Sequence, residues 1–418
     1  MGAILIKNAT IVDTMSSHHL KKRDILIVNG TINQIGTNIS NADAKEINKP
    51  NLHVSCGWFD SSVNLGEPGY EDRETIANGL ATAAASGFTH IAVNPYTNPV
   101  PDSKSGIQYL QGKAKGHAVS LHPVGALTMK SEGENLAELF DMASEGAVSF
   151  YDYLHPIENA NLLKIALQYA QNFDALVQSF PMNPSIARSG MVNEEVNSTK
   201  LGLKGIPALS EELQISRDLY LLEYTGGKLH IPTISTKKSV QLIREAKKRG
   251  LDVSCSVSVN NLYLTDDTLE SFNSHYKLLP PLRTKSDTKA LLKGLKDGTI
   301  DGVTSQHDPR TIEEKKTEFE HAAYGSIGLE SCFGALNTTV EIEVAVQALM
   351  GLKKRFGIPC NGVSEGVKAD LTLFNPSGDW TFNVSDILAT SKNAAMLDQA
   401  MRGKVYGIIA NKKLVLNG

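Results

Sequence analysis

A repeated alternation of strand and helix patterns through the middle of the chain constrains its fold more than any other feature. Short apolar runs typical of strands alternate with amphipathic runs typical of helices. The predicted strands cover residues 88–94, 118–127, 147–153, 174–180, 228–235, 251–258 and 300–306, and the predicted helices cover residues 74–87, 134–146, 159–173, 210–227, 237–250 and 286–299. Such units predict parallel strands joined by helical crossovers, and their number favours a closed (β/α)8 barrel over an open sheet.

Both ends of the chain carry β-rich runs without intervening helix patterns. The runs cover residues 3–13, 24–36, 369–376 and 403–418, and turn signals separate them. We therefore expect a small β-sandwich domain assembled from residues 1–52 and 366–418, and a barrel over residues 53–365. A length of 418 residues suits one barrel and one small domain.

Charge, hydropathy and cysteine usage narrow the classes of partner and the compartment. The formal net charge is −4 and the isoelectric point is near 6.3, which gives no reason to expect nucleic acid or an anionic membrane as partner. The sequence has no signal-peptide pattern and no apolar run of membrane-spanning length. The four cysteines are scattered without a C-x-x-C pair. We therefore expect a cytoplasmic protein without structural disulfides.

In a barrel of this class, chemistry lies at the carboxyl ends of the strands. Those ends are predicted at SSVNLGEPG (61–69), SFYDYL (149–154), VQSFPMN (177–183) and TSQHDPR (304–310), among others. No glycine-rich phosphate-binding motif follows any predicted strand, which weakens a nucleotide-binding interpretation.

Several long segments, in order, resemble the dihydroorotase family of the amidohydrolase superfamily. The segments are HVSCGWFD (53–60), EPGYEDRETIANGLATAAASGFT (67–89), KLLPPLRTKSD (277–287), LKDGTIDGVTSQHDP (295–309) and YGSIGLE (324–330). The resemblance covers nearly the whole chain and implies a (β/α)8 barrel beside a small β-sandwich. Family members use one or two zinc ions to hydrolyse, or in reverse to form, the cyclic amide of dihydroorotate.

The chain departs from the family pattern where the resemblance places the metal. Zinc-binding histidines of the family correspond to Ser62, Asn64, Gln178 and Thr233 here. Zinc prefers imidazole, thiolate or carboxylate ligands, and hydroxyls or amides are weak neutral substitutes. The resemblance therefore predicts no bound zinc and no other cofactor in this chain.

Further departures remove the expected general base and the substrate contacts. Gln306 replaces an Asp that binds metal and accepts a proton, and Asp152 is the one matched carboxylate ligand that survives. Gly66 replaces an Arg that grips a carboxylate, and Tyr96 and Leu279 replace substrate-binding Asn residues. These positions, with His307, define a vestigial pocket without an intact catalytic residue.

The remaining reactive side chains have structural interpretations. His230 and His307 stand without the family's metal partners, and we expect them to be structural or vestigial. Cys56 and Cys255 are expected to be buried and inert. Arg283 matches the family's P-P-L-R segment and is expected to support that loop.

The pattern of loss resembles the inactive, metal-less pseudo-dihydroorotases of the family. Such chains are known there as scaffolds for aspartate transcarbamoylase, the preceding enzyme of pyrimidine biosynthesis. The resemblance therefore implies a structural or regulatory partner of aspartate transcarbamoylase, with self-association as a further possibility.

Two other functions stay open from the residues alone. The first is a hydrolase of a cyclic amide with a remodelled site that uses Asp152, His307, Asp308 or a cysteine. The second is a small-molecule-binding protein that uses the vestigial pocket. Four aromatic residues would line that pocket, namely Tyr96, Tyr151, Tyr153 and Phe180.

Overall fold

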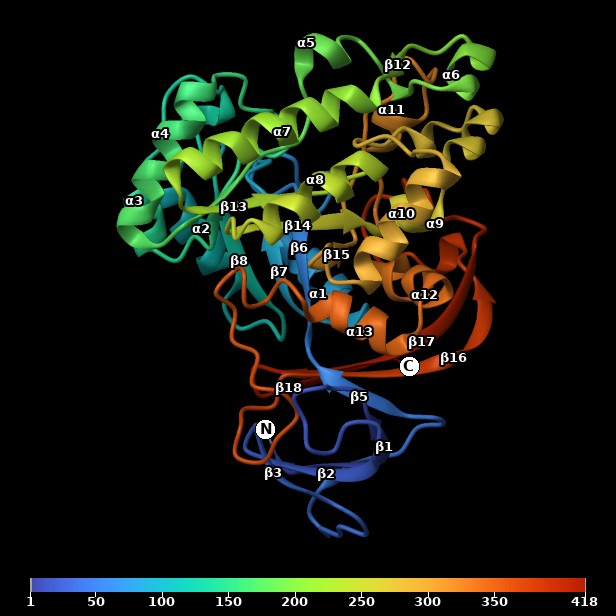
Figure 1. Ribbon diagram of the computed structural model, residues 1–418. Helices are drawn as coiled ribbons and strands as arrows, with labels where there is room; N and C mark the ends of the chain where they lie inside the picture. Colours follow the sequence, from blue (N-terminus) through green and yellow to red (C-terminus); the bar gives the residue numbers. More distant parts are fainter. Residues whose placement is uncertain (1, 418) are drawn as a thin grey trace.

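Eight parallel strands form a nearly closed barrel in the computed structural model, which describes residues 2–417 (Figure 1). Around the barrel the strands are β6 (Trp58–Val63), β7 (Phe88–Val93), β8 (Ser120–Gly125), β9 (Ser149–Phe150), β10 (Leu176–Gln178), β13 (Lys228–Ile231), β14 (Val253–Ser258) and β15 (Gly302–Thr304). Beyond β15, a parallel bridge between Val63 and His307 returns the chain to β6. The predicted (β/α)8 class is confirmed.

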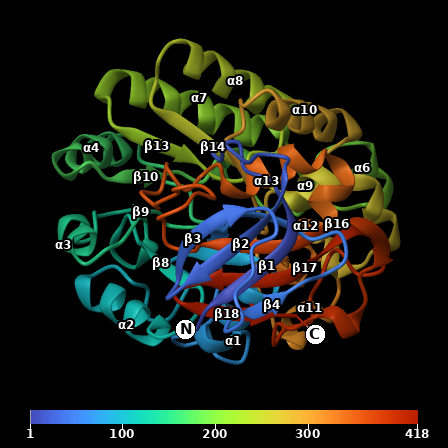
Figure 2. The same ribbon diagram turned by 90° about the horizontal axis from the view of Figure 1, so that it is seen from below.

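Helices surround the barrel strands (Figure 2). The helices of the described residues are α1 (Ile76–Ala85), α2 (Lys104–Ala114), α3 (Leu139–Ser144), α4 (Ala160–Ala170), α5 (Pro184–Ala187), α6 (Val196–Leu201), α7 (Ala208–Thr225), α8 (Lys237–Lys248), α9 (Val259–Tyr263), α10 (Lys285–Lys296), α11 (Ile312–Lys315), α12 (Leu329–Thr339) and α13 (Ile342–Met350). Of these, α5, α6 and α11 lie above the barrel in Figure 1. The hydroxyls of Thr75, Thr236 and Thr284 accept backbone N–H groups in the first turns of α1, α8 and α10. These caps satisfy amides that the helix leaves unpaired, and so define where the helices begin.

Short elements complete the connections between the barrel strands. They are a two-stranded pair, β11 (Val192–Asn193) with β12 (Gly205–Ile206), and the 3-10 turns η1 (Met129–Ser131), η2 (Gln171–Phe173), η3 (Asp266–Ser271), η4 (Ser274–Tyr276) and η5 (Val384–Asp386). No helix within residues 2–417 is long and apolar enough to cross a membrane.

Both ends of the chain build a second sheet below the barrel (Figure 1). Its strands are β1 (Ile4–Ile11), β2 (Lys22–Val28), β3 (Thr31–Gly36), β4 (Lys45–Ile47), β5 (His53–Cys56), β16 (Leu371–Thr381), β17 (Ala400–Ala410) and β18 (Lys413–Leu416). The order is β18-β17-β16-β5-β1-β2-β3, with β4 beside β1. Strand β5 pairs with β16 and β1 in this sheet. Gly57 then links β5 to β6, the first barrel strand. Residues 1 and 418 of the predicted small domain lie outside the described residues.

Strand β16 buries both faces over Leu371–Phe374, and β17 does so over Ile408–Ala410, which joins the small sheet to the barrel. Leu371 and Leu373 lie in the core of the small sheet, whereas Phe374 lies in the barrel core. Ile408 and Ile409 of β17 divide in the same way. Successive side chains of a strand point to opposite faces, so one pair of strands contributes to two apolar cores.

One predicted strand is much shorter than its sequence pattern. The run at 147–153 is extended only over Ser149–Phe150. Tyr153 has a positive φ of 53°, and the carboxylate of Asp152 binds the backbone of a neighbouring loop. The chain therefore leaves the barrel directly after Phe150.

Candidate functional site

The residues predicted to form the vestigial pocket gather at the carboxyl ends of the barrel strands, which we call the mouth. They come from segments far apart in the sequence, and parallel strands bring these segments to one edge. Of these residues, Tyr96 alone is not buried, and the buried members are Ser62, Asn64, Gly66, Asp152, Gln178, Thr233, Leu279, Gln306 and His307. The side chains therefore lie inside the protein and not on an open surface.

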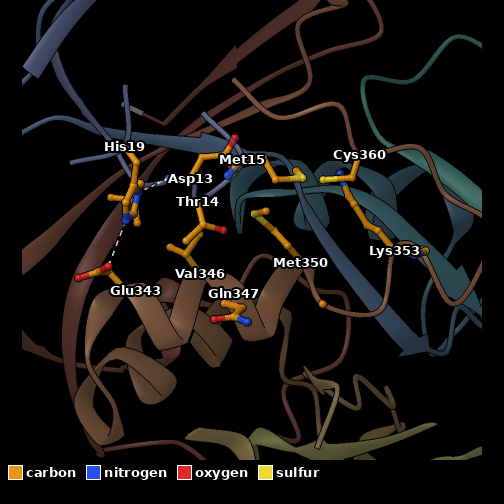
Figure 3. A pocket seen from close by; sticks show the side chains of 13 residues that line it. Asp13, Thr14, Met15, His19, Glu343, Val346, Gln347, Met350, Lys353 and Cys360 are labelled. Atoms are coloured by element: carbon orange, nitrogen blue, oxygen red, sulfur yellow. Dashed lines mark hydrogen bonds and ion pairs between the residues drawn. The ribbon is translucent and has the colours of Figure 1, made fainter. Parts of the chain in front are cut away.

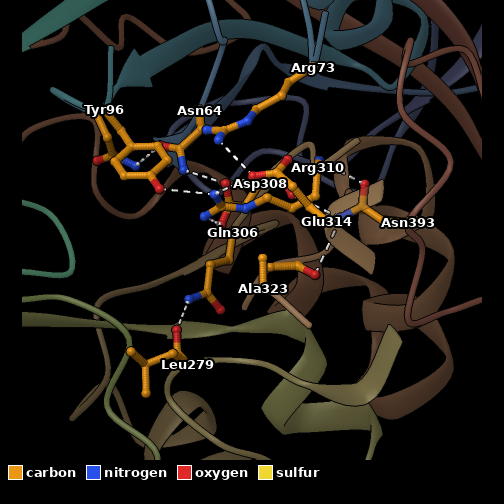
Figure 4. A network of polar contacts seen from close by, with 12 residues as sticks. Asn64, Arg73, Tyr96, Leu279, Gln306, Asp308, Arg310, Glu314, Ala323 and Asn393 are labelled. Atoms are coloured by element: carbon orange, nitrogen blue, oxygen red, sulfur yellow. Dashed lines mark hydrogen bonds and ion pairs between the residues drawn. The ribbon is translucent and has the colours of Figure 1, made fainter. Parts of the chain in front are cut away.

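A hydrogen-bonded network centred on Asp308 occupies one side of the mouth (Figure 4). The Asn64 amide donates to Asp308 Oδ1 over 2.8 Å, and Arg310 Nη2 donates to Asp308 Oδ2 over 2.8 Å. Arg310 Nη1 donates to the Tyr96 hydroxyl over 2.9 Å. Burial opposes the charge of Arg310, but Asp308 and Tyr96 outweigh it and raise the pKa of the guanidinium. Arg310 is therefore a buried cation paired with a buried carboxylate.

Asn94, directly after β7, hydrogen-bonds to both Ser62 and Asn64, two of the positions where the family resemblance expects zinc ligands. Its amide donates to Ser62 Oγ over 3.0 Å and to Asn64 Oδ1 over 3.0 Å. The Asn64 side chain thus donates to Asp308 and accepts from Asn94. Both polar atoms of Asn64 have protein partners, so its amide is held in one orientation.

Aromatic rings pack beside this network. The ring centroids of Tyr96 and Tyr153 are 5.3 Å apart, and those of Tyr151 and Tyr153 are 6.0 Å apart. Burial raises the pKa of Tyr151 and Tyr153 well above the usual value, so both hydroxyls stay protonated. The guanidinium of Arg310 lies over the Tyr96 ring, with 4.9 Å between Cζ and the centroid. Phe180 packs in the same apolar cluster.

Gln306 closes the mouth from the side of β15. Its amide donates to the Leu279 carbonyl over 2.6 Å. A cavity of about 10 Å³ lies between these residues and Asp308. That volume holds about one water molecule.

Asp152 has both carboxylate oxygens occupied by one neighbouring loop. Oδ1 accepts from the N–H groups of Leu127 and Thr128 over 2.8 and 2.9 Å, and Oδ2 accepts from the Thr128 hydroxyl. Burial raises the pKa of Asp152 against these hydrogen bonds. Gln178, on the next strand, donates to Ser149 Oγ over 2.8 Å.

His230 and Thr233 lie where β13 enters the mouth. His230 Nδ1 is 2.8 Å from Ser254 Oγ, and its Nε2 is 3.2 Å from Ser256 Oγ. Burial holds the pKa of His230 well below 6.5, so the ring is neutral. The backbone N–H of Thr233 donates to Ser256 Oγ over 3.1 Å. Both ring nitrogens of His230 therefore have protein partners.

His307 contacts the start of α12. Its Nδ1 accepts from the N–H groups of Gly328 and Leu329 over 3.2 and 3.4 Å. Burial lowers the pKa of His307 to about 3. The neutral ring therefore carries its proton on Nε2, and this atom has no hydrogen-bond partner within residues 2–417.

The backbone leaves no room for a side chain at Gly66. A Cβ atom there would lie 1.9 Å from the Tyr70 carbonyl oxygen, and the Tyr70 N–H donates to the Gly66 carbonyl over 2.7 Å. The turn between these residues is therefore built around glycine. The arginine that the resemblance expects here would require this turn to open.

The donor set at the mouth does not fit zinc. Four of the expected ligand positions offer hydroxyl or amide groups, and Asp152 already binds three protein donors. Within residues 2–417, no three His, Cys, Asp or Glu side chains come close enough to hold a metal ion.

Sequence reasoning missed the residues that hold the mouth together. Arg310 and Asn94 were not singled out, and Asp308 was considered only for catalysis. The opposite charges two residues apart in SQHDPR are the sequence signal for the Asp308–Arg310 contact. No local signal points to Asn94.

The barrel, its composite sheet and the site at the strand ends define an amidohydrolase-like fold. L-hydantoinase from Arthrobacter aurescens matches with a TM-score of 0.87 and 21% identity, covering 100% of this chain and 96% of that one. D-hydantoinase from Thermus sp. matches with a TM-score of 0.84 and 22% identity, covering 99% and 95%. At this identity the likeness shows the fold alone.

The sequence relatives specify the family. The dihydro-orotase-like family model matches residues 53–239. The dihydroorotase of Pelotomaculum thermopropionicum is 36% identical over 420 residues, which is 99% of this chain and 98% of the relative. That of Ruminiclostridium cellulolyticum is 37% identical over 422 residues, again 99% and 98%. The chain belongs to the dihydroorotase family.

Proposed function

We propose that this chain is a non-catalytic member of the dihydroorotase family that supports pyrimidine biosynthesis as a structural partner of aspartate transcarbamoylase. The observation that carries the proposal is the hydrogen bonding of Gln306. It stands where the family's general base is expected, and its amide is hydrogen-bonded to the Leu279 carbonyl over 2.6 Å. An amide has no usable basicity near neutral pH, so it cannot take a proton from water.

The neighbouring polar groups support the same proposal. Asp308 lies two residues after Gln306, and it is paired with Arg310 and with the Asn64 amide. Asp152 is held by the loop at Leu127 and Thr128. A remodelled hydrolase that used either carboxylate would need it to face a substrate, and each carboxylate has protein partners instead.

The close packing around Gln306 also favours a role without substrate. The cavity beside Gln306 encloses about 10 Å³. Pockets for small molecules usually enclose about 300 Å³ or more. The Tyr96 and Tyr153 rings pack against each other, and Tyr96 also packs against Arg310.

An exposed apolar stripe on α7 supports assembly with another protein. Leu209, Leu213, Tyr220 and Tyr224 expose 55%, 45%, 73% and 74% of their surface. Their spacing places all four on one face of the helix. Exposed apolar patches of this kind are typical of protein–protein contacts.

The first test is dihydroorotate hydrolysis by the purified chain, incubated with zinc and bicarbonate beside an active family member. We expect no turnover above background, and metal analysis after dialysis is expected to find far less than one zinc per chain. Zinc-dependent turnover would contradict the proposal and would mean that the ligands lie elsewhere.

The second test is co-purification with aspartate transcarbamoylase from the same organism. We expect a stable complex by size-exclusion chromatography with light scattering. The double variant Tyr220→Ser/Tyr224→Ser should weaken it, whereas Val384→Ser, at an exposed apolar residue outside α7, should not. Absence of a complex for the unmodified chain would remove the partner from the proposal and leave the loss of catalysis to the first test.

A further inference from the structure

Two thiols meet below the barrel, at the end opposite the mouth. Cys56 is the last residue of β5, and Cys360 lies in the segment between α13 and β16. They are 304 positions apart in the sequence, yet their sulfur atoms are 3.4 Å apart. A disulfide has a sulfur–sulfur distance of about 2.05 Å, so the pair needs an approach of about 1.3 Å to bond.

Charged side chains surround the pair. Lys353 is buried, and its Nζ lies 3.9 Å from Cys56 Sγ and 2.7 Å from Asp370 Oδ2. Asp370 also lies 3.2 Å from His90 Nε2. A fixed ammonium group beside a thiol favours the thiolate, which is the reactive form of cysteine.

The two thiols differ in access. Cys360 is only partly buried and lines a cavity of about 190 Å³ together with Met15 and Lys353 (Figure 3). Cys56 is buried, although it borders a second cavity of about 540 Å³ that also contains His90 and Asp370. A small oxidant in solution can therefore reach Cys360 more easily.

The pKa shifts of the two thiols also distinguish Cys360 from Cys56. A hydrogen bond with Cys56 lowers the pKa of Cys360, and the Lys353 charge and the Gly362 N–H lower it further. Burial and the nearby Asp13 raise it, and the resulting pKa is about 7. The same hydrogen bond and burial raise the pKa of Cys56. Cys360 therefore ionises more readily than Cys56, and it is also the more accessible thiol.

We propose that Cys360 and Cys56 form an oxidant-sensitive modification site that hydrogen peroxide converts to an intramolecular disulfide. The Cys360 thiolate attacks one peroxide oxygen, the O–O bond breaks, and hydroxide leaves and takes up a proton as water. The resulting sulfenic acid is attacked by Cys56, which loses its proton as the S–S bond forms. The S–O bond breaks, and a second water leaves. Two thiols are oxidised, and one peroxide is reduced to two waters.

The bridge would connect two parts of the fold. Cys56 ends a strand of the small sheet, whereas Cys360 follows a helix that packs against the barrel. The disulfide would therefore tie the small sheet to the barrel below β6. The other two cysteines, Cys255 and Cys332, are buried, and burial raises the pKa of both thiols.

The experiment treats the native full chain with equimolar hydrogen peroxide, blocks the remaining thiols under denaturing conditions and maps the peptides by mass spectrometry. We expect two blocked thiols, at Cys255 and Cys332, a loss of two hydrogen atoms and one cross-linked peptide joining Cys56 to Cys360. Four blocked thiols, or a cross-link involving another cysteine, would overturn the proposal. This readout needs no variant, so it does not depend on a mutant that folds.

Variants then assign the order of attack. In Cys56→Ser, Cys360 should stop at the sulfenic acid and be labelled by dimedone. In Cys360→Ser, Cys56 should be labelled at least tenfold more slowly. Equal labelling of the two variants would overturn the assignment of Cys360 as the attacked thiol.

Discussion

The two ends of the barrel have opposite characters. At the mouth, where barrel enzymes place their chemistry, the polar side chains of Asn64, Asp152 and Gln306 bind the protein itself. At the other end, Cys360 borders a cavity next to a buried lysine. Position in a fold therefore does not by itself define a reactive site. A site needs groups whose bonding capacity is still available to a ligand or reagent.

The largest expected effect concerns the charged pair at the mouth. Arg310→Met leaves Asp308 buried without its cation, and this should lower the free energy of unfolding by about 3 to 5 kcal/mol. The double variant Asp308→Leu/Arg310→Met should lose less than the single variant, because no charge is then unpaired. Urea denaturation of both variants measures the difference. Equal losses would indicate that Arg310 acts through packing alone.

The next prediction tests whether the turn at Gly66, where the family resemblance expects an arginine, can accept any side chain. Gly66→Ala should lower the free energy of unfolding by about 1 to 3 kcal/mol, because its Cβ would lie 1.9 Å from the Tyr70 carbonyl. Gly112→Ala is the matched control, since a Cβ there meets nothing within 4 Å and α2 gains a better helix former. If Gly66→Ala unfolds at the same urea concentration as the unmodified chain, the turn is not built around glycine.

A third prediction uses pH to compare the ends. The folded pKa values of His307 at the mouth and His122 below the barrel are both about 3, the first because of burial and the second because of burial and His90. The unfolded value is about 6.5, so the unfolded chain binds more protons below it. The contribution of these neutral histidines to the free energy of unfolding is therefore complete above pH 6.5 and decreases as the pH drops toward 3.

For His307 the decrease in the free energy of unfolding between pH 7 and pH 5 should be about 2 kcal/mol. His307→Gln should remove this part of the pH dependence, measured by urea denaturation at several pH values, whereas the exposed His321→Gln should not. An unchanged slope in His307→Gln would mean that this ring is not held neutral by the fold.

The smallest expected effect belongs to the other end. Oxidation of Cys56 and Cys360 should raise the melting temperature by about 2 °C, because a cross-link restricts the unfolded chain. The Asp308–Arg310 contact lies at the far end of the barrel, so Arg310→Met should show the same increment. A rise that disappears in Arg310→Met would mean that the two ends are coupled.

The periodicity of the sequence determined the fold class. Alternating strand and helix runs between residues 88 and 306 predicted the parallel barrel, because a crossover helix has few other ways to return to the sheet. The β-rich ends predicted a sheet shared by both termini. The sequence also located the mouth, since residues after each strand meet at one edge.

Only the tertiary structure decided what those residues do there. The partners of Asn64 and Gln306 are Asp308, Asn94 and Leu279, which come from distant segments. The meeting of Cys56 with Cys360 has the same origin. Local periodicity reports which face of an element is buried, whereas hydrogen-bond partners and pKa shifts depend on distances that only the folded chain defines.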